Sequence, residues 1–159
     1  MEQQYNIKGL VDAVISEDSD DVLEISRRVG ALSALLEQED GQSLLAGYKR
    51  AANILAAEEK KDGATFAGEI DTSAMTMDEE LSLARAVAAA HSGVGDLLAG
   101  NDYSGAISAL ARLRGPVDAF FEKVLVNDPD AAVRANRLNL LARLRDTMHL
   151  VADFSKVGG

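Results

Sequence analysis

The sequence has no cysteine, no tryptophan and only two prolines, and aromatic residues make up 4% of it. The absence of cysteine excludes a disulfide scaffold, a thiolate metal site and a cysteine nucleophile. Few aromatics beside 47% hydrophobic residues, mostly alanine and leucine, are typical of packed helices rather than of a sheet. No apolar run reaches the ~18 residues of a membrane span, and the acidic N-terminus MEQQYNIKG does not resemble a signal peptide. We therefore expect a soluble, cytoplasmic chain with no membrane partner.

The net charge of −10 is distributed unevenly along the 159 residues. Residues 1–40 carry −7, residues 41–102 carry −5, and residues 103–159 carry +2. Phosphate binding depends mainly on lysine and arginine, so this balance argues against nonspecific nucleic-acid binding and against a DNA partner. Any contact with a polyanion is expected to use selected basic side chains and the C-terminal half.

Apolar residues recur at spacings of three and four along most of the chain, which predicts amphipathic helices. No strand pattern, heptad or repeat of fixed period is present. We expect one all-α domain over residues 1–159, an antiparallel bundle of about six or seven helices, with acidic helices in residues 1–40. The predicted helices cover residues 5–16, 22–39, 42–60, 77–99, 102–113, 116–126 and 129–154.

The predicted helix ends carry specific signals. The cluster EDSDD at 17–21 supplies caps for the second helix, and Asp40-Gly41 is expected to end that helix. Thr76-x-x-Glu79 has the pattern of a capping box, Gly100 suits a left-handed position, and Asn101 suits the next cap. Residues 61–76 have no clear period and form the longest predicted loop. On the fourth helix the expected apolar side consists of Leu81, Ala84, Val87, Ala88, Leu97 and Leu98.

The stretch Leu110–Leu141 contains both prolines and predicts two helix starts. Gly115-Pro116 and Asp128-Pro129 each read as an N-cap followed by the first helical residue. Proline suits that position because its missing N–H would be unpaired there. Phe120, Phe121, Leu138 and Leu141 are expected in the core.

The third helix has one apolar side and one polar side. Leu44, Tyr48, Ala51, Ala52 and Leu55 form the apolar side, and Tyr103, Ile107, Leu110 and Leu113 do so on the fifth helix. Lys49, Arg50, Asn53 and Lys60 fall in a sector of ~100° facing away from the apolar side. From spacing alone, this sector is either an ordinary solvated face or a polar strip that faces a ligand.

No catalytic motif is present: there is no Walker-type phosphate loop, no GxGxxG after a strand and no HExxH. His91 and His149 have no carboxylates at metal-ligand spacing, and the serines show no nucleophile elbow. A free-standing enzyme is therefore the weaker class of hypothesis.

The last helix places Arg137 inside its apolar stripe. An unpaired buried guanidinium costs several kcal/mol, so Arg137 must have a partner, and Asp118 on the preceding helix is the expected one. Arg134 and Arg145 lie at the edge of the stripe, where each could reach a carboxylate or a phosphate. Asn136, Asn139 and Arg143 lie on the opposite, wet side.

Three segments resemble a known family: YKRAANILAAEEKKDG (Tyr48–Gly63), LARLRGPVDAFFEKVLVNDPDAAVRANRLNLL (Leu110–Leu141) and VADFSK (Val151–Lys156). They are similar to the C-terminal region of the bacterial glycyl-tRNA synthetase β subunit. Val133–Leu141 also resembles the LRxxRLxLL signature of the helical anticodon-binding domain of arginyl-tRNA synthetases. The resemblance covers nearly the whole chain and is weakest in residues 61–76.

The resemblance implies an anticodon-binding domain, with its core in residues 42–159, cut from a larger β subunit. The family enzyme is an α2β2 heterotetramer that joins glycine to its tRNA using ATP and Mg, with a class II catalytic centre in the α subunit. Partners implied are the anticodon arm of tRNA-Gly, the α subunit and the remaining β-subunit domains. No cofactor, metal or catalytic residue is expected in this domain, so the fragment alone should not catalyse aminoacylation.

The family pattern implies tRNA contacts on the third helix, before the proline corner and on the last helix. Proteins recognise single-stranded bases by hydrogen bonds to their edges and by stacking. Tyr48 and Phe66 are possible stacking residues, although Tyr48 lies on the apolar side. The alternative hypothesis is a helical interaction module that docks against other synthetase domains, with Gly93 and Gly95 accepting a partner helix. The implied contacts are Lys49, Arg50 and Asn53 in the third helix, Arg112 and Arg114 before the proline corner, and Arg134 and Asn136 in the last helix.

Overall fold

The computed structural model describes residues 7–14, 22–66 and 68–157, and this part of the chain is helical without a strand. The prediction of an all-α bundle of six or seven helices is confirmed. None of the described helices is long and apolar enough to cross a membrane. The α-helices are α1 (Ile7–Val14), α2 (Val22–Glu37), α3 (Glu39–Asp62), α4 (Asp78–Ala99), α5 (Tyr103–Ala111), α6 (Arg114–Lys123) and α7 (Ala131–His149), and two 3-10 turns are η1 (Thr72–Ala74) and η2 (Phe154–Lys156).

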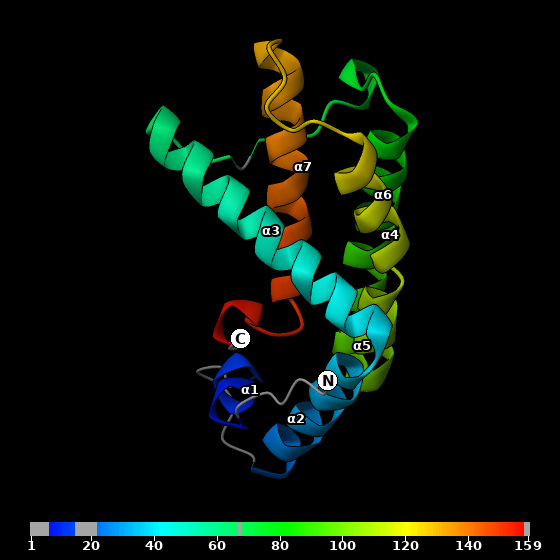
Figure 1. Cartoon of the computed structure of the whole chain (residues 1–159). Coiled ribbons are helices and arrows are strands. Elements are labelled where there is room, and N and C mark those ends of the chain that lie inside the picture. Colours follow the sequence, from blue (N-terminus) through cyan, green and yellow to red (C-terminus); the bar gives the residue numbers. More distant parts are fainter. Residues whose placement is uncertain (1–6, 15–21, 67, 158–159) are drawn as a thin grey trace.

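The long helix α3 runs obliquely across the molecule and joins its parts (Figure 1). It packs against α2 at one end and against α6 and α7 along its length, while α4 packs against α5, α6 and α7. Helix α1 lies against α2 and against η2 near the other end of the chain. The backbone N–H of Asp153 donates to the carbonyl of Ala13 over 2.8 Å, which joins the two ends of the described chain.

The core follows the predicted stripes on α3 and α7. Leu44, Tyr48, Ala51 and Leu55 are buried on α3, as predicted. Phe120, Leu138 and Leu141 are also buried, as predicted, while Phe121 is only half-buried. Its ring meets Phe120 edge-on at a centroid distance of 5.5 Å. Neighbouring residues on a helix point ~100° apart, so the two rings cannot share one direction, and the Phe121 ring lies beside Arg50 of α3.

Helix α4 buries a different face from the predicted one. Its buried residues are Glu80, Leu83, Val87, Ala90 and Val94, whereas Leu81, Ala84, Leu97 and Leu98 are only partly buried. The helix is rich in alanine, which is accepted on both buried and exposed faces. Its few large apolar side chains are too few to show from the sequence which face is buried. Val87 is buried as predicted, but the rest of the predicted face was wrong, because the buried face is rotated about the helix axis by about one residue.

Several helix ends lie one or two residues from their predicted positions. Asp130, not Asp128, caps α7, and its carboxylate accepts from the N–H groups of Ala132 and Val133. Asp128 instead accepts from the N–H of Asp130, 2.9 Å away, in the turn before the helix. At α6 the cap position is Leu113, so Pro116 lies within the first turn, where it costs no hydrogen bond.

The other predicted helix-end signals are wrong or lie outside the described residues. The Thr76–Glu79 capping box is wrong, because Met77 occupies the N-cap of α4 without a side-chain bond. Asn101, with φ of 61°, takes the left-handed position expected for Gly100, and Asp102 rather than Asn101 caps α5. Asp40-Gly41 lies inside the first turn of α3 rather than ending α2. The predicted caps at 17–21 lie outside the described residues.

Tyr103 is a buried titratable residue, so its ionisation makes the stability of the core depend on pH. The side chain is 7% exposed, its hydroxyl donates to the Val151 carbonyl over 3.4 Å, and the Arg28 guanidinium lies 5.1 Å from the ring centre. Burial raises the pKa of Tyr103 from 10.0 to about 12, against the opposing charge of Arg28. The folded state therefore favours the neutral phenol.

We expect the alkaline loss of stability to be smaller in the Tyr103→Phe variant. Because the folded pKa lies above the unfolded one, the stabilisation is fully present below pH 10 and is lost as pH rises toward 12. Two pKa units correspond to roughly 2.7 kcal/mol. Urea unfolding of both proteins between pH 9 and about pH 12 measures the difference. Parallel stability–pH curves would contradict the assignment.

Candidate functional site

Arg114, a predicted tRNA contact, forms ion pairs with three carboxylates where α2, α3 and α6 meet. It pairs with Asp40, with Asp118 at 3.3 Å and with Glu39 at 3.6 Å. The hydrogen bond to Asp40 raises the pKa of the Arg114 guanidinium above its ordinary value. These ion pairs hold the start of α6 against the start of α3. Because three carboxylates neutralise the Arg114 guanidinium, it attracts a phosphate only weakly.

Arg134, also a predicted tRNA contact, joins α7 to the C-terminal end of α3. Its guanidinium lies 2.7 Å from Glu58 and 2.8 Å from Asp62, and its Nε donates to Asn127. The hydrogen bonds to Asp62 and then Glu58 raise the pKa of Arg134. The hydrogen bond from Arg134 in turn lowers the pKa of Asp62. The Phe66 ring lies 5.7 Å from the same guanidinium. This side chain is therefore held by α3 rather than directed at solvent.

Arg137 is buried, with its side chain 3% exposed, but the predicted pair with Asp118 is wrong. The guanidinium pairs with Glu80 of α4 at 2.7 Å and with Asp128 at 3.4 Å, and it also donates to the carbonyl of Leu125. Asp118, itself on α6, instead pairs with Arg114 at 3.3 Å. Asp118 was expected as the partner because α6 directly precedes α7 in the sequence. In the structure α4, which carries Glu80, packs against α7.

Asn136, the last of the predicted contacts on α7, is 5% exposed and fully engaged. Its amide accepts from the N–H of Asp71 at 2.8 Å and donates to the carbonyl of Asp71 at 2.9 Å. One turn further along, Asn139 accepts from the N–H of Gly68 at 3.3 Å. The segment after α3 thus covers the side of α7 that the sequence predicts to be wet, and Asn136 is not on a free surface.

Four of the predicted contacts remain available: Lys49, Arg50, Asn53 and Arg112. Lys49 is half-buried, and the other three are exposed. Within the described residues, none of the three cations has a carboxylate at salt-bridge distance. The α3 strip, defined here as Lys49, Arg50 and Asn53, is therefore a set of hydrogen-bond donors without internal partners among the described residues.

The aromatic residues near these donors differ from the expected ones. Tyr48 is 2% exposed, and its hydroxyl is 2.6 Å from Nε2 of His149, so it is a core residue rather than a stacking surface. Burial, then the charge of Asp153, raises the pKa of Tyr48 above its ordinary value. Phe121 is the ring that the sequence reasoning missed: the Arg50 guanidinium lies 4.6 Å from its centre. Two adjacent phenylalanines on one helix were the available signal, since only one of them can face the core.

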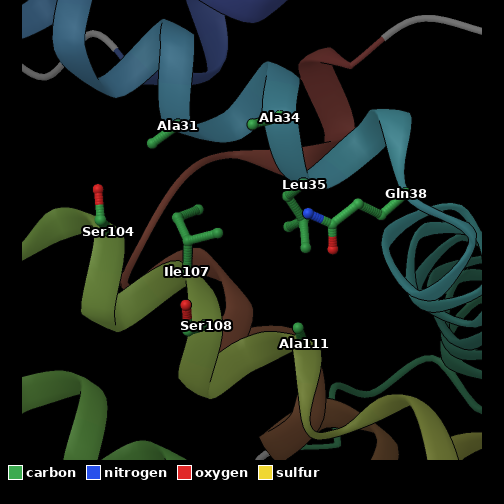
Figure 2. A pocket seen from close by; sticks show the side chains of 8 residues that line it. All are labelled: Ala31, Ala34, Leu35, Gln38, Ser104, Ile107, Ser108 and Ala111. Carbon is green, nitrogen blue, oxygen red and sulfur yellow. The ribbon is translucent and has the colours of Figure 1, made fainter.

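Three hollows lie between helices of the described chain. The α3–α6 groove, of about 390 Å³, is lined by Ser43, Ala46, Gly47, Arg50, Asp118, Phe121 and Glu122. A second, of about 270 Å³, lies between α4 and α5 and includes Arg112. The third, of about 190 Å³, lies between α2 and α5, with Ser104 and Ser108 on its α5 side (Figure 2). Charged side chains adjoin the first two, and only the α3–α6 groove meets the α3 strip.

Residues 44–154 match the family model of the DALR anticodon binding domain, which is more than half of the chain. The chain is 51% identical over 152 residues to the glycine–tRNA ligase beta subunit of Rhodospirillum centenum, with 94% of this chain and 21% of that protein covered. It is 53% identical over 159 residues to the protein of the same name from Phenylobacterium zucineum, with 100% and 24% covered. The chain thus spans between a fifth and a quarter of the length of these relatives.

Proposed function

From the premise that the chain belongs to the DALR anticodon-binding-domain family, we propose that it recognises the anticodon arm of tRNA-Gly for a glycine–tRNA ligase beta subunit. The relatives named above support the choice of glycine and of this subunit. ATP-dependent ligation, of class II type, then takes place outside this chain, in an α2β2 assembly with the synthetase alpha subunit. The chain itself contributes binding and no catalytic group.

The observation that carries the proposal is the α3 strip beside the α3–α6 groove. Donors that have no internal partner and lie next to a groove are available to phosphates and base edges, and single-stranded loops are read by such groups together with stacking. Arg114, Arg134 and Arg137 are paired with carboxylates, so they do not serve this purpose. The net charge of −10 is compatible with RNA binding when a few cations at one place remain unpaired.

We expect Lys49→Ala and Arg50→Ala each to weaken binding of an anticodon stem-loop of tRNA-Gly. Each removes one positive charge that no internal carboxylate neutralises, so the slope of log affinity against log salt should decrease by roughly 0.7 if that charge meets one phosphate. Fluorescence anisotropy with labelled stem-loop over a salt series measures both quantities.

Arg85→Ala is the matched control, because Arg85 is exposed on α4, away from the α3 strip, and its removal changes the net charge equally. If all three variants bind as tightly as the wild type, with the same salt slope, the α3 strip is not the RNA-binding face.

A helical interaction module is the second candidate, favoured by two glycines of α4 that have open space beside them. A Cβ added at Gly93 or Gly95 would meet nothing within 4 Å, so a partner helix has room to approach there. Hydrogen exchange of the assembled full-length enzyme, with and without tRNA, separates the two functions. RNA-dependent protection of α3 supports anticodon recognition, and RNA-independent protection of α4 supports docking.

A further inference from the structure

Helices α3 and α6 approach closely at Gly47, which lines the α3–α6 groove. A Cβ at this position would lie 2.6 Å from Cγ1 of Val117 on α6, which is closer than side chains tolerate. Ser43, Ala46, Gly47 and Arg50 follow one another at spacings of three, one and three, so they lie along one face of α3. On the α3 side, small residues therefore line the groove, and Arg50 is the last of its lining residues along this helix.

Arg50 and Phe121 together form a stacking surface at one wall. The guanidinium lies 4.6 Å from the ring centre, Arg50 is exposed and Phe121 is half-buried. Planar guanidinium groups and aromatic rings are the surfaces on which unstacked bases are held, at roughly 1–3 kcal/mol per base. No carboxylate at salt-bridge distance holds Arg50 elsewhere within the described residues.

Two carboxylates, Asp118 and Glu122, adjoin the same groove one helical turn apart on α6. Oδ2 of Asp118 accepts from Nε of Arg114, whereas Glu122 has no hydrogen-bond or ionic partner among the described residues. An ionised carboxylate only accepts hydrogen bonds. It therefore suits a base with an exocyclic amino group, such as the N4 amine of cytosine, and disfavours a base with a carbonyl at that place, such as uracil.

We propose that the α3–α6 groove holds one unstacked base that carries an exocyclic amino group, with Arg50 and Phe121 as the stacking surface and Glu122 as the acceptor of the amino group. This inference rests on the proposed function and assigns a specificity-determining role to a residue that sequence reasoning did not select. Arg50 contributes affinity for any base, because stacking does not depend on base identity. Glu122 contributes the discrimination between amino-bearing bases and uracil.

The test uses the 159-residue chain and anticodon stem-loops with cytosine or uracil at each of the three anticodon positions in turn. The wild type should bind the cytosine form about tenfold more tightly at the position that enters the groove. Glu122→Gln should reduce this ratio below about threefold, because an amide donates as well as accepts and can pair with either base. Arg50→Lys should weaken both forms equally and leave the ratio unchanged, since it keeps the charge but loses the planar stacking group.

Glu37→Gln, an exposed carboxylate outside the groove, is the matched control and should keep the full ratio. A Glu122→Gln variant that retains the full ratio overturns the inference while leaving the proposed function intact. If the wild-type chain binds no stem-loop at any salt concentration, the proposed function fails together with this inference. Protection of Phe121 and Glu122 in the assembled enzyme without RNA assigns the groove to a protein partner and also overturns it.

Discussion

Replacing Arg137 with methionine should lower the free energy of unfolding by about 3–5 kcal/mol, because it leaves the carboxylate of Glu80 buried without its cation. Glu80 is 0% exposed, and Arg137 lies 2.7 Å from it. Among the described side chains, the one other donor to Glu80 is the Thr76 hydroxyl, 3.4 Å away. Urea denaturation followed by circular dichroism measures the loss.

The double variant Glu80→Leu, Arg137→Met shows whether the single variant loses stability through the unpaired charge of Glu80 or through lost packing. Glu80 Oε2 and Arg137 Nε already lack hydrogen-bond partners within the described structure, so the pair is only partly satisfied. Replacing both by apolar residues of similar volume is expected to restore most of the stability, to within about 1 kcal/mol of the wild type. Arg143→Met, an exposed arginine on the same helix, should change stability by less than about 0.5 kcal/mol. A single Arg137 variant as stable as this control would contradict the account.

Gly41→Ala is expected to be the most damaging small substitution, at about 3 kcal/mol. A Cβ at Gly41 would lie 1.9 Å from the carbonyl oxygen of Leu35 and 2.6 Å from its carbonyl carbon. Both are backbone atoms at the end of α2, so relief requires a shift of the α2–α3 junction rather than of a side-chain tip. This cost exceeds the ~1 kcal/mol that alanine gains over glycine inside a helix.

Gly95→Ala is the matched control for that experiment. Gly95 is exposed within α4, and a Cβ there meets nothing within 4 Å, so the same chemical change should stabilise the protein by about 0.5–1 kcal/mol. Thermal and urea unfolding of both variants should therefore move in opposite directions. Equal shifts would mean that the close approach at Gly41 relaxes without cost.

The sequence was informative where large apolar side chains mark one face of a single helix, as on α3, and less so on the alanine-rich α4. Apolar spacing on α3 predicts Leu44, Tyr48 and Leu55 in the core, and all three are buried. Helix starts and ends were located to within about three residues, except that the last helix was predicted to run to residue 154 and α7 ends at His149. Several adjacent Asp, Asn and Gly residues can serve as caps, and only the folded backbone selects among them. The order of α-helices and the fold class depend on the same local patterns, so they were also predicted correctly.

Contacts between distant segments were beyond the reach of local patterns. Arg137 needed a partner, but the choice between Asp118 and Glu80 depends on which helix packs against α7. The available signal was Glu80 itself, which lies three and seven residues before Leu83 and Val87 and so belongs to the buried stripe of α4. The pairs of Arg114 with Asp40 and of Arg134 with Glu58 were likewise not predicted, because each joins residues more than 70 positions apart in the sequence. The pair of Arg114 with Asp118, four residues along α6, was within the reach of local spacing.

The contact of α1 and α2 with the rest of the bundle bears on where the cooperative folding unit begins. The family model begins at residue 44, yet Leu10, Leu32 and Leu36 belong to the same buried cluster as the leucines of α3 and α5. A polypeptide trimmed to residues 44–154 would lose α1, α2 and the hydrogen bond between Asp153 and Ala13, and would expose the apolar surfaces of α3 and α5. Such surfaces favour self-association. Helices α1 and α2 thus cover apolar surface of the segment that the family model matches, so we expect the cooperative folding unit to extend to residues before 44.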